Sequence, residues 1–196
     1  RFNNKNIQIL YFYLGHKLIA EWQTTMNEEE ANSKRRGGGP YISPNIHRRY
    51  IYAGDTAVAF IDYKVGSTES TTTGPFGMSK PVHPYEYTLY YIHANHIGQP
   101  IMVTDTQQNI RWLAQYSPTG NATILQGDIE FNLRSPGQYY DAETGFHDNY
   151  FRTYDPQAGH YLEPDPIGPL SINEPYGYAA QQPRRYVDPE GLLLFA

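Results

Sequence analysis

Alternating apolar and polar positions recur along the first two thirds of the chain, in short runs broken at glycine. Residues 11–21 (YFYLGHKLIAE) and 50–61 (YIYAGDTAVAFI) carry alternating apolar side chains on both sides of Gly15 and Gly54. A period of two residues is that of a β-strand, and a glycine between two such runs marks a tight turn. Both segments are therefore predicted to be β-hairpins.

A third unit follows the same pattern. Residues 90–105 turn at Gly98-Gln99-Pro100, and residues 110–116 form a further strand that ends at the polar turn 117–121. The chain has 19 Tyr, 17 Gly and 15 Pro, and only 18% of its residues are charged. Tyrosine favours strands, whereas glycine and proline divide a chain into short pieces. We therefore predict an all-β fold of antiparallel hairpins with many turns.

Two long segments interrupt this pattern. Residues 27–44 carry a Glu run, a basic run and three consecutive glycines, and residues 67–84 are rich in Thr, Ser, Gly and Pro. Such segments offer little apolar surface to bury, so both are predicted to be mobile surface insertions. Residues 21–36 could form a short helix that ends at Gly37.

From residue 138 onward a shorter repeat takes over. Residues 140–145 (YDAETG) and 154–159 (YDPQAG) are two copies of Tyr-Asp-x-x-x-Gly. In each copy the aspartate can accept hydrogen bonds from the amides of the following turn, and the glycine can adopt a positive φ. Repetition at this period indicates units that bury their faces against one another.

Composition and charge exclude several classes of function. The net charge of −5 disfavours nucleic acid as the main partner, because phosphate binding needs concentrated Lys and Arg. The chain has no Cys, and no apolar run reaches the ~20 residues of a membrane span. His93 and His96 have a spacing seen in metal sites, but no third ligand accompanies them. We expect no cofactor and no metal.

Residues 140–192 resemble the Rhs repeat-associated core domain of YD-repeat bacterial toxins. The motifs that carry the resemblance are R-x-Y-D-P-x-x-G-x-Y at 152–161, P-D-P-I-G at 164–168 and P-x-x-x-x-D-P-x-G-L at 183–192. Upstream, Y-x-H-x-N-H-x-G-x-P at 91–100 resembles the repeat that commonly precedes this core. One departure is Pro169, where the family usually has leucine.

The resemblance implies a hollow cocoon of antiparallel β-hairpins around a toxic C-terminal region, closed by the core domain. The domain organisation expected on this basis is YD/Rhs repeat units over 1–137, with the mobile insertions at 27–44 and 67–84, and the core domain over 138–192. Residues 193–196 would begin a truncated C-terminal toxin domain. The first residues show neither an initiator Met nor the apolar segment of a signal peptide, so the chain is expected to be internal to a longer protein.

The resemblance also implies self-cleavage between Leu192 and Leu193. Asp165 and Asp188 would be the cleaving groups and Arg152 a supporting cation. Pro183, Pro189 and Gly191 are further positions of the terminal motif.

The chemistry of the residues agrees with that role. Amide hydrolysis by side chains alone needs a base for water and an acid for the leaving nitrogen, and two close carboxylates sharing one proton supply both. Asp165 and Asp188 are each followed by Pro and, two residues after that, by Gly, which suggests two copies of one turn.

The expected partners are the chain's own C-terminal toxin domain, retained without a covalent link after cleavage, the remaining N-terminal Rhs shell, and secretion machinery such as a type VI spike. The expected location is the bacterial cytoplasm before export and a target cell afterwards. Two alternatives stay open: a YD-repeat adhesion or interaction module that does not cleave, and a structural cap whose aspartates only brace turns. The intact mass distinguishes them, because only self-cleavage yields a product ending at Leu192.

Overall fold

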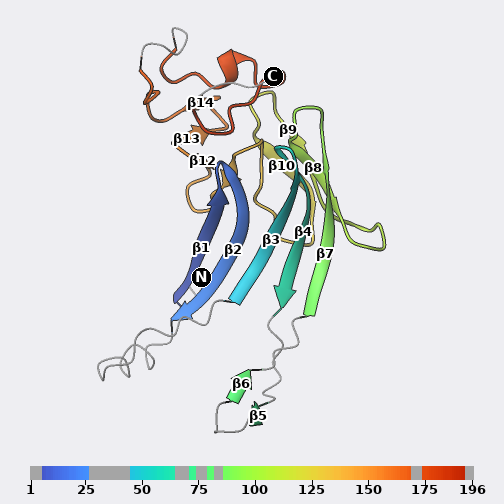
Figure 1. Ribbon diagram of the computed structural model, residues 1–196. Helices are drawn as coiled ribbons and strands as arrows, with labels where there is room; N and C mark the ends of the chain where they lie inside the picture. The colour runs from blue at the N-terminus through green and yellow to red at the C-terminus, as the bar shows by residue number, and fades with distance from the viewer. Residues whose placement is uncertain are drawn as a thin grey trace, which may run out of the picture.

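An eight-stranded antiparallel sheet forms most of the structure, a computed structural model that describes residues 6–26, 45–64, 71–73, 79–81, 86–168 and 174–192 (Figure 1). Its strand order follows the chain, so each strand pairs with the preceding strand of the same sheet. The strands are β1 (Asn6–Leu14), β2 (Lys17–Met26), β3 (Asn45–Ala53), β4 (Thr56–Lys64), β7 (Glu86–Ala94), β8 (Pro100–Thr104), β9 (Ile110–Tyr116) and β10 (Ala122–Gly127).

A second, four-stranded sheet follows in the chain and lies beyond one end of the large sheet (Figure 1). It contains β11 (Tyr139–Tyr140), β12 (His147–Asn149), β13 (Arg152–Asp155) and β14 (His160–Tyr161), and a 3-10 helix, η2 (Ala179–Gln181), comes after it. Two short strands, β5 (Thr71–Thr73) and β6 (Ser79–Pro81), pair with each other between β4 and β7 and lie at the opposite end.

The predicted all-β fold of antiparallel hairpins is confirmed. The helix considered for residues 21–36 is wrong over its first part, because β2 runs to Met26 and pairs with β1 on one side and β3 on the other. Residues 27–44, the first predicted insertion, lie outside the described residues. Of the second, 67–84, the structure describes only β5 and β6.

Glycine and local register shifts shape one end of the large sheet. Gly15 and Gly54 stand first in the two-residue turns of the β1–β2 and β3–β4 hairpins, each with a φ of +60° that residues with a side chain rarely adopt. The ladders of these hairpins and of β7–β8 shift register near the turn, at Phe12/Tyr13, Ile51/Tyr52 and His93/Ala94. Such bulges increase strand twist and bend, so the three hairpins deform at the same end.

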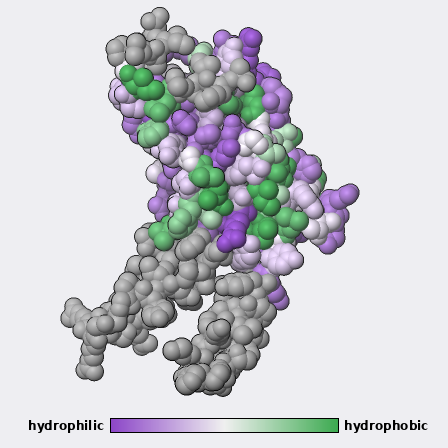
Figure 2. Space-filling view, in the orientation of Figure 1, coloured by the Kyte–Doolittle hydropathy of each residue, from purple (hydrophilic) through white to green (hydrophobic). Residues whose placement is uncertain are grey.

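The main core lies between this sheet and the segment of residues 128–138 that leaves β10. Phe60 and Val103 are fully buried, and Phe131 from that segment packs on both Phe60 and Trp112, with ring centroids 5.5 Å and 5.0 Å apart. Tyr90 stacks on Phe60 at 4.9 Å. Elsewhere the sheet is less covered, and apolar patches remain visible over it in Figure 2.

The four-stranded sheet has a separate core of tyrosines, Tyr154, Tyr161 and Tyr178, whose ring centroids lie 4.6 to 5.8 Å apart. His147 of β12 is buried beside it and pairs through Nδ1 with Gln138 Oε1 at 2.9 Å. Burial, helped by the nearby Arg134 cation, lowers the pKa of His147 to about 3. This imidazole is therefore neutral in the folded chain at neutral pH.

Within the described residues, no helix is long and apolar enough to cross a membrane.

Truncating Phe60 tests the aromatic core. Phe60→Ala removes a side chain with no exposed surface, so the free energy of unfolding should fall by about 3–5 kcal/mol. Tyr87→Ala, on the adjacent β7 but 70% exposed, should change it by no more than about 0.5 kcal/mol. Chemical denaturation of both variants measures the difference, and equal losses would contradict the assignment of this core.

His147 should make the fold sensitive to acid. In the unfolded chain His147 has its ordinary pKa of 6.5 and binds a proton below pH 6.5. In the folded chain it binds this proton only when the pH falls to about 3. The free energy of unfolding should fall by about 1.4 kcal/mol per pH unit in this window on account of His147. Denaturation at pH 7 and pH 4.5 should show a correspondingly shallower pH dependence in His147→Phe, and an unchanged slope would contradict the neutral imidazole.

Candidate active site

Asp165 and Asp188 each begin a turn of the same backbone form. The carbonyl of Asp165 accepts the amide of Gly168 at 3.0 Å, and that of Asp188 accepts the amide of Gly191 at 3.3 Å. Both glycines have positive φ, +81° and +70°. The side chains differ, since Asp165 Oδ1 accepts the amide of Ile167 and Asp188 Oδ1 accepts that of Leu192, each at 2.9 Å.

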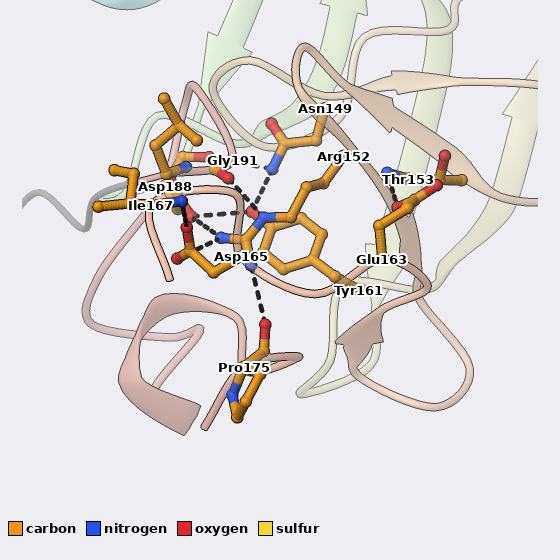
Figure 3. A network of polar contacts seen from close by, with 11 residues as sticks. Asn149, Arg152, Thr153, Tyr161, Glu163, Asp165, Ile167, Pro175, Asp188 and Gly191 are labelled. Atoms are coloured by element: carbon orange, nitrogen blue, oxygen red, sulfur yellow. Dashed lines mark hydrogen bonds and ion pairs between the residues drawn. The ribbon is translucent and has the colours of Figure 1, made fainter. Parts of the chain in front are cut away.

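Arg152 brings the two turns together from the start of β13 (Figure 3). Its Nη2 atom lies 3.1 Å from Asp188 Oδ2 and 3.5 Å from Asp165 Oδ2, so both carboxylates meet at one nitrogen. All three side chains are nearly excluded from solvent, at 2%, 5% and 4% exposure for Arg152, Asp165 and Asp188. The three residues singled out in the sequence thus form one buried cluster.

The remaining donors of Arg152 bind main-chain carbonyls. Nε donates to the Gly191 carbonyl and Nη1 to that of Pro175 at 3.3 Å. The Gly191–Leu192 peptide group is therefore held at both ends, its oxygen by Arg152 and its nitrogen by Asp188. Leu192 is the last residue described, and Leu193, on the other side of the expected cut, lies outside the described residues.

Two further residues of the cluster, Tyr161 and Asn149, had no role assigned from the sequence, although Tyr161 is the last residue of the motif at 152–161. Tyr161 donates its hydroxyl to Asp188 Oδ2 at 3.0 Å, and the Arg152 guanidinium lies 3.6 Å from the centre of its ring. Asn149 donates through Nδ2 to the Tyr161 hydroxyl at 2.6 Å and to the Asp188 carbonyl at 3.0 Å. The sequence contained a signal for Asn149, because His147 and Asn149 are polar residues at the two inward-facing positions of β12.

Close backbone approach fixes the terminal motif. A side chain on Gly137 would meet the carbonyl oxygen of Pro189 at 1.9 Å, and one on Gly191 would meet that of Asn149 at 2.7 Å. Pro189 is buried, whereas Pro183 is half-buried and lies in the preceding turn. Pro169, the departure from the family pattern, lies outside the described residues.

The histidines considered for metal binding have separate partners. His93 Nε2 lies 3.0 Å from Thr104 Oγ1, and His96 Nε2 lies 2.9 Å from the carbonyl of Arg184. Among the described residues, no three His, Asp or Glu side chains gather as a metal site would require.

Comparison with known proteins connects this chain to a family. The model of the family described as RHS protein matches residues 89–125, which extend from β7 into β10. A probable deoxyribonuclease, RhsA of Dickeya dadantii, is 48% identical over 152 residues, which cover 74% of this chain and 10% of that protein. The toxin protein Tse5 of Pseudomonas aeruginosa is 31% identical over 109 residues, covering 56% of this chain and 8% of that one.

The fold recurs in a solved structure of a much longer chain. A crystal structure of TcdB2-TccC3-Cdc42 superimposes on 97% of this chain with a TM-score of 0.63, at 19% sequence identity and over 8% of its own length. At this identity the similarity concerns the fold alone. This chain spans a tenth or less of the length of each of these proteins. From the family model and the identity to RhsA, the chain belongs to the Rhs family.

Proposed function

We propose that this chain is the closing segment of an Rhs toxin shell and that it cleaves itself once, between Leu192 and Leu193. The observation that carries the proposal is the meeting of two buried carboxylates, Asp165 and Asp188, at one guanidinium nitrogen beside the Gly191–Leu192 peptide. In the proposed mechanism the two carboxyl groups share one proton, because one must act as a base and the other as an acid.

The proposed reaction uses that shared proton. The ionised carboxylate takes a proton from water while the water oxygen attacks the Leu192 carbonyl carbon. The protonated carboxyl then gives its proton to the amide nitrogen of Leu193, the C–N bond breaks, and the products are a carboxyl group on Leu192 and an amine on Leu193. Arg152 and Asp188 bind the preceding peptide group, between Gly191 and Leu192, and so hold the segment in position for the attack.

The edges of the large sheet support a place in a larger shell. Strand β1 is an edge strand of nine residues, and several of its apolar side chains are at least 38% exposed: Ile9, Tyr11, Phe12 and Leu14. A long apolar edge of this kind is a template for a further strand. We propose that the remaining N-terminal Rhs shell supplies it, with residues 1–137 as repeat units and 138–192 as the core that closes the shell.

The other partners follow from the same proposal. The shell would enclose the protein's own C-terminal toxin domain, beginning at residues 193–196, in the bacterial cytoplasm. A secretion machine such as a type VI spike would then deliver the protein into a target cell. This role agrees with a relative in the family that is named toxin protein Tse5.

A non-cleaving structural cap, or a YD-repeat interaction module, is the second candidate. It is favoured by the turn hydrogen bonds of both aspartates, to Ile167 and Leu192, because an aspartate that only braces a turn makes the same bonds.

Removing either carboxylate's charge should stop the cut. Asp188→Asn and Asp165→Asn keep the side-chain shape and its ability to accept the turn amides but cannot take part in proton transfer, so each should leave the full-length chain uncleaved by intact mass. Asp155→Asn is the matched control, since Asp155 also braces a turn, accepting the amides of Gln157 and Ala158. Cleavage in both test variants would refute the carboxylate mechanism, and a wild-type product ending at Gly191 would move the cut to the Gly191–Leu192 bond.

Cleavage by itself should not release the C-terminal part. Hydrolysis of one bond leaves the packing intact, and Leu193, Leu194 and Phe195 would each lose ~1.5–3 kcal/mol of burial on exposure to water. Gel filtration of the cleaved full-length protein should therefore give one peak in native buffer and two in denaturant. Separation of the pieces in native buffer would make the cut itself the release step.

A further inference from the structure

The two carboxylates have unequal surroundings. Asp188 accepts hydrogen bonds from the Leu192 amide on Oδ1 and from Arg152 and Tyr161 on Oδ2. Asp165 accepts the Ile167 amide on Oδ1, and its Oδ2 faces the same Arg152 nitrogen at the longer distance of 3.5 Å. Hydrogen bonds donated to a carboxylate stabilise its charged form, so this arrangement favours the charge on Asp188.

The Tyr161 hydroxyl donates its proton to Asp188 Oδ2. Its oxygen already accepts a hydrogen bond from Asn149 Nδ2, which directs the hydroxyl proton to Asp188 Oδ2. Burial and the neighbouring charge of Asp188 raise the pKa of Tyr161 above its ordinary value, so the phenol keeps this proton.

Asn149 holds the same turn through the main chain as well. The Nδ2 group that binds Tyr161 also donates to the Asp188 carbonyl, and both partners are acceptors, which agrees with this orientation of the amide. Asn149 and Tyr161 are both fully buried, and they come from different strands, β12 and β14. The pair therefore connects Asp188 to β12 and β14 of the four-stranded sheet.

We propose that Tyr161 and Asn149 are positioning residues that keep Asp188 as the ionised member of the pair, so that Asp188 acts as the base and Asp165 carries the proton as the acid. This inference rests on the proposed self-cleavage. It assigns separate roles to two aspartates that the sequence presents as equivalent.

The test measures self-cleavage of the full-length chain at several pH values. The chain is made by pulse-labelled cell-free translation, chased into buffers from pH 4 to pH 8, and the uncleaved fraction is followed over time. Tyr161→Phe keeps the ring and its contact with Arg152 but removes one donor to Asp188. We expect cleavage about tenfold slower on the acid side, and the acid limb of the profile moved up by about one pH unit, because the base then ionises less readily.

The matched control is Tyr154→Phe. Tyr154 belongs to the same buried ring cluster, but its hydroxyl donates to the Thr119 carbonyl at 2.7 Å. The pH profile of this variant should stay that of the wild type. Asn149→Leu, which removes the amide at similar volume, should slow cleavage at least as much as Tyr161→Phe and move the acid limb in the same direction.

Three results separate the possibilities. Cleavage that persists in both Asp188→Asn and Asp165→Asn would overturn the proposed function itself. Loss of cleavage in Asp188→Asn, together with wild-type rates and profiles in Tyr161→Phe and Asn149→Leu, would overturn only the positioning roles. A slower rate at every pH with an unmoved acid limb would also overturn them, because a general loss of packing slows the reaction without changing which carboxylate ionises.

Discussion

The C-terminal part of the described chain depends on one buried cation, the guanidinium of Arg152. It binds Asp188 and the Gly191 carbonyl in the terminal motif, and it faces Asp165 and the Pro175 carbonyl from a second segment. A buried charge is costly unless it is fully paired, and removing one partner leaves the rest uncompensated. The turns at 165–168 and 188–191 must therefore assemble around β13 together or not at all.

The same pairing requirement explains why the residues of the candidate active site also stabilise the fold around it. The amides of Ile167 and Leu192 stabilise the turns and also bind the carboxylates of the candidate site, so a change in this geometry also disturbs the packing. Gly137, whose missing side chain admits the Pro189 carbonyl, extends this coupling to the segment that leaves the large sheet. That segment carries Phe131 into the main core, so the terminal motif is connected to the eight-stranded sheet through a few closely packed residues.

The large sheet has the opposite character, because its strands follow one another in the chain and can be extended at either edge. Successive hairpins with bulges at the same end produce curvature without any long-range contact. Among the described residues, the first and last strands of this curved sheet each pair on one side only, so the sheet can continue into a larger shell. The four-stranded sheet instead packs around its own tyrosine core and buried ion cluster.

Much of the fold was predictable because it is local. Alternation around Gly15 and Gly54 determines a hairpin within about a dozen residues, and the Tyr-Asp-x-x-x-Gly repeats determine their own turns, with the Asp141 and Asp155 side chains accepting the turn amides as the pattern implies. The helix expected after Glu21 failed for a tertiary reason. Its first residues pair with β1 and β3, and this pairing overrides local propensity.

In the candidate site, too, only the local features were predictable from the sequence. The sequence by itself determined that Asp165 and Asp188 begin two similar turns, since Asp, Pro and Gly act within four residues. Only the tertiary structure decided that these turns meet at Arg152, because residues 23 positions apart come together through β13 and the segment around Pro175. The tertiary structure also makes the surroundings of the two aspartates unequal, because the hydroxyl of Tyr161 and the amide of Asn149 reach Asp188 from other strands. No local sequence pattern encodes a contact between distant parts of the chain.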